Sequence, residues 1–322
     1  MTETTERPLV TFALFAYNQE KYIREAVEGA FSQTYEPLEI ILSDDCSSDR
    51  TFEIMEEMAS AYSGPHRVKV RRGETNKGLA GHINEVIAAS EGDIISWAAG
   101  DDIALPERTS IFAQALINDS TLCGVHSDVI EIDVDGNTIR ERRHSEKEYR
   151  TNLIDAVNTG QSVITQSHAF RRSVFTTFGP FRTDLTQEGI AMAFRESALG
   201  KVAFVDKCLT LYRVGSGVST YSGGDLEKRK RLEPIKYTNW YLSAFRQMQE
   251  DSKMLPKHLS RLLENKLRRN VLFYSNLLKI NDGRGLIIPL LLNIMIAPLD
   301  TKSIRAVARR VTPGSIYSKL IR

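Results

Sequence analysis

Short apolar runs alternate with segments of helical periodicity along the first 120 residues of the chain. Runs that suit buried strands are Leu9–Phe15, Leu38–Leu42 and Ile94–Ala98. Between them lie segments whose apolar residues recur every three or four positions, which is the spacing of one helix face. These apolar positions are Ile23, Val27, Ala30 and Phe31, then Phe52, Met55, Met58, Ala59 and Tyr62, then Ile83, Val86 and Ile87. Such alternation predicts βα units and a largely parallel sheet that is covered by helices.

The rest of the chain divides at a stretch rich in Gly and Ser. A strand pair is expected around Val129–Ile132, with a turn at Asp135–Asn137. Residues 216–225 predict a loop or a domain boundary. Beyond it, apolar residues at helical spacing predict a helical region; they are Trp240, Tyr241, Phe245, Leu259, Leu262, Leu263, Leu267 and Val271. We therefore predict a domain over residues 1–222, with halves at about 8–120 and 121–222, and a helical C-terminal extension over 223–322.

Two acidic pairs directly follow predicted strands. One is Asp44-Asp45 and the other is Asp101-Asp102. If the strands are parallel neighbours, their carboxyl ends lie at one edge of the sheet, where ligands bind in open α/β folds. Adjacent carboxylates at the end of a buried strand are costly unless a cation lies against them, such as a divalent metal that carries a diphosphate.

Helix capping is the alternative role for these carboxylates. Asp101 or Asp102 could cap the helix that follows, and Ser47, Ser48 or Asp49 could cap the helix after the first pair. For the first pair we expect both roles, with the serines as caps and the acidic pair left for a ligand.

Five stretches of the chain together form a recognisable set. They are Phe15–Ile23, Ser32–Tyr35, Glu39–Thr51, Asn76–Leu79 and Gly100–Asp102. In their order and spacing the chain resembles the inverting glycosyltransferases of family 2 over about residues 8–220. The resemblance implies an α/β fold of the GT-A type, a Rossmann-like mixed sheet flanked by helices. It also implies transfer of a sugar from a nucleotide-diphosphate sugar.

The resemblance places Phe15, Ala16 and Tyr17 in the nucleotide pocket, with Tyr17 near the base and Asp45 at the edge of the base. These roles make chemical sense, because a uracil ring offers one N–H that a carboxylate can accept, and an aromatic face supplies stacking. The alternative for Tyr17 is a partly buried core aromatic.

Asp101 and Asp102 match the Asp-x-Asp type element of the family. The resemblance implies that Asp101 contacts the ribose or the sugar and that Asp102 alone ligates Mg or Mn, with the diphosphate and water completing the shell. Glu20 belongs to the matched stretches and is assigned to the nucleotide-sugar site. Lys77 and Arg213 are candidates for facing the phosphates; the alternatives are a solvated lysine and an ordinary surface arginine.

Sugar transfer also needs a base that deprotonates the acceptor hydroxyl. The family places a Glu-Asp pair at the start of a helix, with the Asp as base, and the matching stretch here is Glu188-Gly189. Gly189 therefore fills the position of the base. We predict that Glu188 serves instead. The alternatives are a one-residue slip in the alignment, a weakened or different enzyme, and a glutamate that only stabilises the helix dipole.

The predicted function is a metal-dependent inverting glycosyltransferase that uses a nucleotide-diphosphate sugar, with UDP-sugar preferred, to extend a surface polysaccharide or glycolipid. The alternative is a glycosyltransferase-like protein that binds nucleotide sugar or scaffolds an assembly complex without turnover, and Gly189 motivates it. A dehydrogenase is disfavoured because no Gly-x-Gly-x-x-Gly follows the first strand. A nucleotidyltransferase is disfavoured because the first loop is not Gly-rich and basic.

The net charge and the cysteines exclude further classes of protein. The formal net charge is only +1, so the chain lacks the large overall positive charge that is typical of nucleic-acid-binding proteins. Cys46, Cys123 and Cys208 are scattered and form no Cys-x-x-Cys spacing, so neither a zinc site nor a disulfide framework is indicated. With a polar start and no secretory signal, the sequence predicts a cytoplasmic enzyme.

The C-terminal extension raises the question of membrane contact. Residues 286–297 are almost wholly apolar, yet shorter than the ~20 residues that span a bilayer. Residues 304–311 then form a basic amphipathic pattern that can lie on an anionic membrane. The two interpretations are peripheral contact with the inner face of the cell membrane, which would favour a lipid-linked acceptor, and a helical hairpin packed on the enzyme or on a second subunit of a homodimer.

Overall fold

The computed structural model describes residues 7–143, 152–216 and 226–281. The chain forms two compact units. The first comprises Met1–Ala156 and Gln161–Gly224, and the second comprises Val157–Gly160 and Asp225–Arg322.

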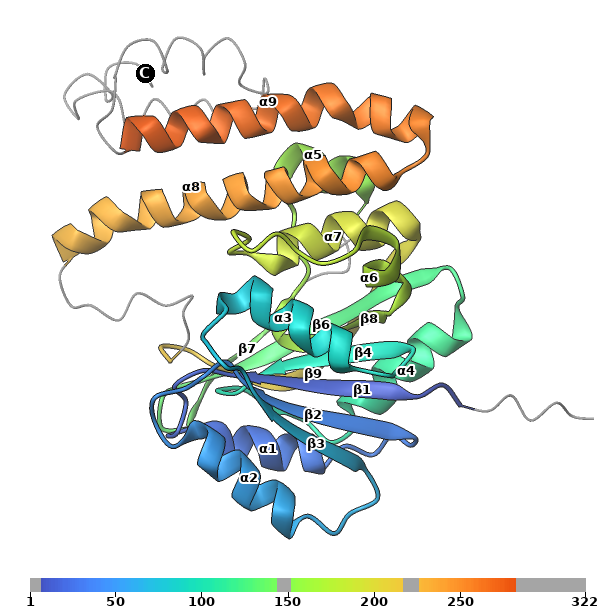
Figure 1. The fold of residues 1–322 in the computed structure, drawn as a ribbon, viewed down its shortest axis with the longest axis vertical. Helices are drawn as coiled ribbons and strands as arrows, with labels where there is room; N and C mark the ends of the chain where they lie inside the picture. Colours follow the sequence, from blue (N-terminus) through green and yellow to red (C-terminus); the bar gives the residue numbers. More distant parts are fainter. Residues whose placement is uncertain (1–6, 144–151, 217–225, 282–322) are drawn as a thin grey trace, which may run out of the picture. The chain divides into compact units, whose positions relative to one another are not determined.

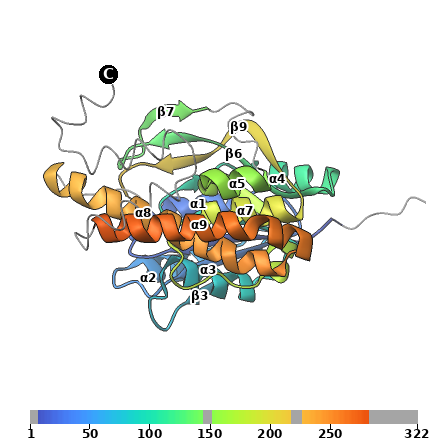
Figure 2. The ribbon, with the colours of Figure 1, turned by 90° about the horizontal axis from the view of Figure 1, so that it is seen from above.

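The first unit is built on a nine-stranded mixed sheet with the order β3-β2-β1-β4-β8-β6-β9-β5, in which β7 pairs with β6 (Figures 1 and 2). The strands are β1 Val10–Ala16, β2 Leu38–Asp44, β3 Arg67–Arg72, β4 Ile94–Ala99, β5 Ile103–Ala104, β6 Leu122–Ile132, β7 Thr138–Arg142, β8 His168–Arg171 and β9 Lys201–Arg213. Strands β1 to β4 run parallel, and β8 is antiparallel to both β4 and β6. The predicted mixed α/β sheet is confirmed.

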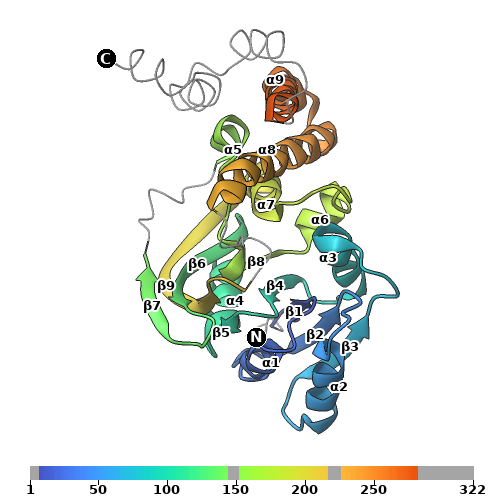
Figure 3. The same cartoon turned by 90° about the vertical axis from the view of Figure 1, so that its left-hand side faces the viewer.

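Helices cover both faces of this sheet, which explains why its central strands are apolar on both sides. One face carries α1, α2 and α4, and the other carries α3, α6 and α7 (Figures 1 and 3). The helices of this unit are α1 Ile23–Phe31, α2 Thr51–Ala61, α3 Gly78–Ala89, α4 Arg108–Asn118, α6 Ser173–Phe178 and α7 Glu188–Leu199, with the short turn η1 at Thr165–Ser167. Helix α5, Leu153–Thr159, spans the chain positions at which the two units divide.

The core follows the predicted periodicity. Ile23, Val27 and Ala30 of α1 pack against Phe12 and Leu14 of β1 in one apolar cluster. On α3 the predicted positions Ile83, Val86 and Ile87 are buried as well.

The predicted strand pair is the hairpin of β6 and β7. The carboxylate Oδ1 of Asp133 accepts the backbone N–H groups of Asp135 and Asn137, each at 2.9 Å. Gly136 has a φ of 89°, a conformation that glycine adopts without steric cost.

The second unit contains a pair of long helices. These are α8 Leu226–Asp251 and α9 Lys257–Asn281, joined through the short turn η2 at Ser252–Met254. Tyr241 of α8 stacks on Tyr274 of α9 with ring centroids 5.1 Å apart, and buried leucines extend the contact. The predicted helical region is confirmed.

Among the described residues, no helix is both long enough and apolar enough to cross a membrane. The apolar run 286–297, the basic amphipathic stretch 304–311 and most of the Gly- and Ser-rich segment at 216–225 lie outside the described residues.

We predict that Gly92→Ala destabilises the fold. A Cβ at position 92 would lie 2.4 Å from the backbone nitrogen of Thr11, at the entry to the central strands. Overpacking against backbone costs about 1–3 kcal/mol, which a lowered midpoint of thermal unfolding would report. Gly73→Ala is the matched control, because its nearest contact is 3.2 Å. Equal midpoints for the two variants would contradict the predicted close packing.

Candidate active site

The candidate site lies where β1, β2 and β4 end. Phe15 is in register with Ser43 on one side and with Ala99 on the other, so the three strands end at the same level. The loops after them therefore share one edge of the sheet, as the sequence predicted from the two acidic pairs.

The first strand brings an exposed aromatic side chain to this edge. Tyr17 is 45% exposed, so it is not the partly buried core aromatic that was the alternative. Phe15 lies deeper and meets the His82 ring edge-on with centroids 5.1 Å apart. Burial lowers the pKa of His82 to about 4, which keeps the ring neutral at pH 7. Tyr17 is thus exposed to solvent at the end of β1, while Phe15 and the neutral His82 ring pack together deeper in the chain.

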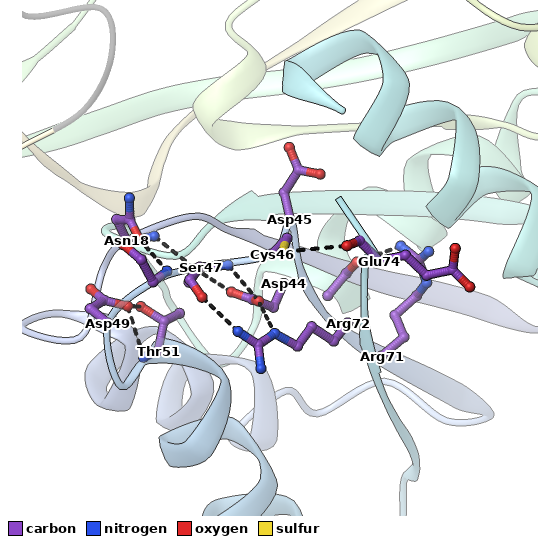
Figure 4. A network of polar contacts seen from close by, with 12 residues as sticks. Asn18, Asp44, Asp45, Cys46, Ser47, Asp49, Thr51, Arg71, Arg72 and Glu74 are labelled. Atoms are coloured by element: carbon purple, nitrogen blue, oxygen red, sulfur yellow. Dashed lines mark hydrogen bonds and ion pairs between the residues drawn. The ribbon is translucent and has the colours of Figure 1, made fainter. Parts of the chain in front are cut away.

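Asp45 connects the end of β2 to the start of α3 (Figure 4). Its two carboxylate oxygens accept the backbone N–H groups of Lys77 and Gly78, each at 2.9 Å. Gly78 has a φ of 69°, which brings both N–H groups within reach. Asp45 fixes the backbone of Lys77 while the Lys77 side chain stays exposed.

The acidic pair after β2 is not left free by serine caps, so that expectation was wrong. The buried carboxylate of Asp44 accepts hydrogen bonds from the backbone N–H and the hydroxyl of Ser47, and it pairs with Arg72 at 3.4 Å (Figure 4). Helix α2 has Arg50 as its N-cap, without a side-chain capping bond. Cys46 adopts a φ of 62°, which turns the chain back toward Asp44. Ser47 therefore contacts Asp44 and does not cap the helix.

Glu20 joins the first loop to the second. Its carboxylate accepts the backbone N–H of Arg50 at 3.0 Å, and its own N–H donates to Asp49 at 3.1 Å. Asn18 does the same from the other side, accepting the N–H of Ser48 at 2.9 Å. These contacts hold the loops after β1 and β2 in one arrangement.

Asp101 and Asp102 are both buried at the end of β4. Oδ1 of Asp102 accepts the backbone N–H of Arg213 at 2.9 Å, and Asp101 accepts the Ser216 hydroxyl at 2.8 Å. Neither carboxylate caps the following helix, since α4 begins after Glu107 without a side-chain cap. Burial raises the pKa of both groups, that of Asp102 well above its usual range, and the neighbouring charge of Asp101 adds to the effect on Asp102.

This carboxylate pair fits a divalent cation. Burial makes it costly for both side chains to carry a negative charge. A positive ion bound between them would lower this cost. Among the described residues no other hydrogen bond reaches Asp102, which leaves Oδ2 for a ligand. No group of three or more His, Cys, Asp or Glu in the described part of the chain is arranged to hold a metal. A cation at this position would therefore need further oxygen ligands from a diphosphate and from water, which is what the sequence predicted.

Arg213 lies beneath the acidic pair and is almost fully buried. Its guanidinium donates to the carbonyl oxygens of Asp101 and Asp133, each at 3.1 Å, and pairs with the carboxylate of Glu25. The same group lies 4.6 Å from the centroid of the Tyr22 ring. Arg213 is thus not an ordinary surface arginine, which was the alternative interpretation. Contact between Arg213 and a phosphate stays a prediction, because the contacts found here are structural.

Glu188 begins α7, beside β8 and the turn η1. Burial raises the pKa of its carboxyl, while the hydroxyl of Thr165 and the imidazole of His168 favour the charged form. His168 in turn is in register with Trp97 of β4, two residues before the strand ends at Ala99. Glu188 is therefore linked to β4 through His168, whose strand partner Trp97 lies two residues before the end of β4.

Gly189 is closely packed and leaves little space for a side chain. A Cβ there would lie 2.3 Å from the Ser162 hydroxyl and 3.1 Å from the Val163 carbonyl oxygen. The Gly189 carbonyl also accepts the Val163 N–H at 3.2 Å. The segment before η1 occupies the space in which an aspartate would project.

Two buried residues near this helix were not predicted from the sequence. His168 and Glu196 are both fully buried, with Nε2 and Oε1 2.8 Å apart. Glu196 lies eight residues after Glu188 on α7, so His168 of β8 interacts with both glutamates of the helix. The only signal in the sequence is the spacing of two glutamates by eight positions, which alone does not identify a partner.

Comparisons with known proteins agree with this geometry. The family model described as Glycosyl transferase family 2 matches residues 11–179, more than half of the chain. A putative glycosyltransferase of Bacillus subtilis, EpsE, is 38% identical over 101 residues, which cover 31% of this chain and 36% of EpsE. An uncharacterized glycosyltransferase of Nostoc sp. is 23% identical over 71% of this chain and 73% of its own length. The chondroitin synthase of Pasteurella multocida is 29% identical over 41% of this chain and 13% of its own length.

Solved structures share the fold at low identity. TarS of Staphylococcus aureus, crystallised with UDP-GlcNAc, superposes with a TM-score of 0.54 at 16% identity and covers 87% of this chain and 95% of that one. A mannosyltransferase of Pyrobaculum calidifontis, in complex with GDP-Man and Mn2+, gives 0.56 at 17% identity over 95% and 85%. The family match and the shared mixed sheet lead to one conclusion: the chain belongs to glycosyltransferase family 2 and adopts the GT-A fold.

Proposed function

We propose that the protein is an inverting glycosyltransferase that moves a sugar from a nucleotide-diphosphate sugar, with UDP as the preferred carrier, to a hydroxyl of a glycan or lipid-linked acceptor. One observation carries the proposal: an exposed aromatic ring and a buried carboxylate pair converge on one edge of the sheet. Such an edge offers a stacking face to the base and negative charge to a metal-bound diphosphate.

The base of the donor is assigned to the groups around Tyr17. Phe15 and Ala16 form the floor, and the Tyr17 ring stacks on the base. Each Asp45 oxygen already accepts one backbone N–H and keeps a second lone pair, so Asp45 can still accept the N–H of a uracil ring. The UDP-GlcNAc bound to TarS supports UDP, whereas the mannosyltransferase complex contains GDP-Man.

The diphosphate and the metal are assigned to the end of β4. Asp102 would be the protein ligand of Mg or Mn, and Asp101 would contact the ribose or the sugar. When bound, the cation stabilises the negative charge that develops on the departing diphosphate. The Mn2+ in the mannosyltransferase complex supports this assignment. Lys77, Glu20 and Arg213 complete the predicted nucleotide-sugar set, and the exposed Lys77 is assigned to the phosphates.

Glu188 is the proposed base. The acceptor oxygen attacks the anomeric carbon, its proton passes to the Glu188 carboxylate, and the bond to the diphosphate oxygen breaks, so the anomeric configuration inverts. Burial raises the pKa of the Glu188 carboxyl above its usual range, which favours proton acceptance by a general base.

A non-catalytic protein that binds nucleotide sugar is the second candidate. The close packing around Gly189 favours it, because the base found at this position in the family has no space here. The two candidates share the donor site and differ only at Glu188.

The cellular setting is proposed as polysaccharide or glycolipid assembly in the cytoplasm, at the inner face of the cell membrane. The chondroitin synthases among the relatives support a polysaccharide role. Contact with the membrane or with a second subunit is assigned to the C-terminal extension.

We predict that Glu188→Gln slows the release of UDP from UDP-GlcNAc in the absence of an added acceptor, where water takes the acceptor's place. Loss of a general base costs about 10²–10⁴-fold in rate, and UDP affinity should not change. The wild-type rate should rise with pH through a pKa above the usual range of a glutamate, and this rise should vanish in the variant. Glu56→Gln, at an exposed position of α2, is the matched control.

A rate equal to wild type in Glu188→Gln would remove Glu188 from catalysis. UDP binding without any release from UDP-glucose, UDP-galactose or UDP-GlcNAc would favour the non-catalytic candidate.

We also predict that Asp102→Asn raises the free energy of unfolding of the ligand-free protein at pH 7. The folded-state pKa of Asp102 lies above the unfolded value, so its contribution to stability is present below pH ~4 and is lost as the pH rises through the folded pKa. Asparagine keeps an acceptor for the Arg213 N–H without the charge. We expect a gain of about 1–2 kcal/mol by urea denaturation, disappearing toward pH ~4. A variant less stable than wild type at pH 7 would show that Arg108 and Arg213 already compensate the charge.

A further inference from the structure

The outward face of α9 carries basic side chains that point away from α8. Lys257, Arg261, Arg268 and Lys279 are separated by four, seven and eleven residues, and all four are exposed. At 100° per residue these spacings keep the four side chains on one side of the helix. We name this set the basic stripe.

The opposite side of α9 is buried within the second unit. Leu263, Leu267 and Leu277 are almost fully buried there. The basic stripe therefore cannot turn inward without exposing this apolar side, so its orientation is fixed by the packing of the unit.

The four stripe residues lack ion-pair partners among the described residues, whereas several exposed cations of the first unit have them. There, Arg50 pairs with Glu53, and Lys69 pairs with Glu91. None of the four stripe residues forms an ion pair with a described residue. On the whole of α9 the acidic residues are limited to Glu264. Glu264 lies on the same side, between Arg261 and Arg268, but four cations to one carboxylate leave this side with a net positive charge, which attracts an anionic partner.

Large apolar side chains are exposed beside these charges. Leu272 is 45% exposed and lies four residues after Arg268, beside the stripe, and Leu262 is 56% exposed about a quarter turn away from it. Met254, in η2 just before the helix, is 64% exposed. A surface that combines cations with a few exposed apolar side chains suits a lipid surface, where the charges meet headgroups and the apolar groups enter the interface.

We propose that the basic stripe binds the surface of an anionic membrane, with α9 lying in the plane of the headgroups. A helix of 25 residues is about 38 Å long, enough to engage several headgroups at once. Only a few apolar side chains are available, so the attraction is mainly electrostatic and sensitive to salt. The proposal refines the peripheral membrane contact assigned to the extension and is independent of the transfer reaction.

Vesicle flotation of the full chain tests the proposal. Wild type should float with vesicles that contain about 30 mol % phosphatidylglycerol at about 50 mM salt, but not with pure phosphatidylcholine, and should be released at about 500 mM. The triple variant Lys257→Gln, Arg261→Gln and Arg268→Gln should lose partitioning by about 100-fold, since each cation near such a surface contributes about fivefold. Glutamine favours helix, and circular dichroism checks that the fold is retained.

The matched control removes three exposed cations from the first unit, through Lys201→Gln, Lys207→Gln and Arg142→Gln. It has the same net charge as the triple variant and should float like wild type. Flotation of the triple variant at the wild-type level would overturn the proposal by assigning binding to another segment. Equal flotation with neutral vesicles would overturn the electrostatic mechanism. Binding to a random-sequence RNA without flotation would identify a different polyanion as the partner. None of these readouts depends on UDP binding, so they stand apart from the proposed transferase activity.

Discussion

Burial of negative charge at the end of β4 is the constraint on which the candidate site depends. Asp101 and Asp102 are removed from water, which raises the pKa of both carboxyl groups. The surrounding chain supplies positive groups on two sides. Arg108, fully buried, comes from α4, and burial lowers its own pKa to about 10. Arg213 comes from β9 and donates its backbone N–H directly to Asp102. These positive groups offset part of the cost of burying two adjacent carboxylates at a sheet edge, and the pKa of Asp102 still stays well above its usual range.

The same arginines connect parts of the fold that are distant in sequence. Arg108 donates to the Trp97 carbonyl of β4 at 2.9 Å and to the Thr210 hydroxyl of β9 at 3.2 Å. Arg213 links β9 to α1 through Glu25 and to the β6–β7 turn through the Asp133 carbonyl. Arg108 and Arg213 therefore connect the part of the sheet built from β1, β2 and β4 to the later strands, directly next to the acidic pair. Removing one of these partners would leave a buried charge uncompensated, which is more costly than losing an exposed ion pair.

The sequence predicted the parts of the structure that repeat locally. Apolar runs and helical spacing identified the βα units, because each element buries one face and that face has a period. The acidic pairs were placed at one edge because parallel strands end together. Contacts between distant residues were not predictable in this way. The bonds of Asp45 to Lys77 and Gly78 depend on positive φ at Gly78, and the closure of Ser47 onto Asp44 depends on the same conformation at Cys46. The His168–Glu196 pair joins a strand to a helix 28 positions later, and no local periodicity encodes it.

We propose that the edge formed by β1, β2 and β4 binds a nucleotide diphosphate through a metal at Asp102. Calorimetric titration with UDP, GDP, dTDP and CDP, with and without Mn2+, tests it most directly on wild type and on Asp102→Ala. Asp206→Ala, an exposed position on β9, is the matched control. We expect UDP binding that requires Mn2+, persists in Asp206→Ala and is lost in Asp102→Ala. Absence of binding by all four nucleotides, or metal-independent binding that Asp102→Ala leaves intact, would contradict it.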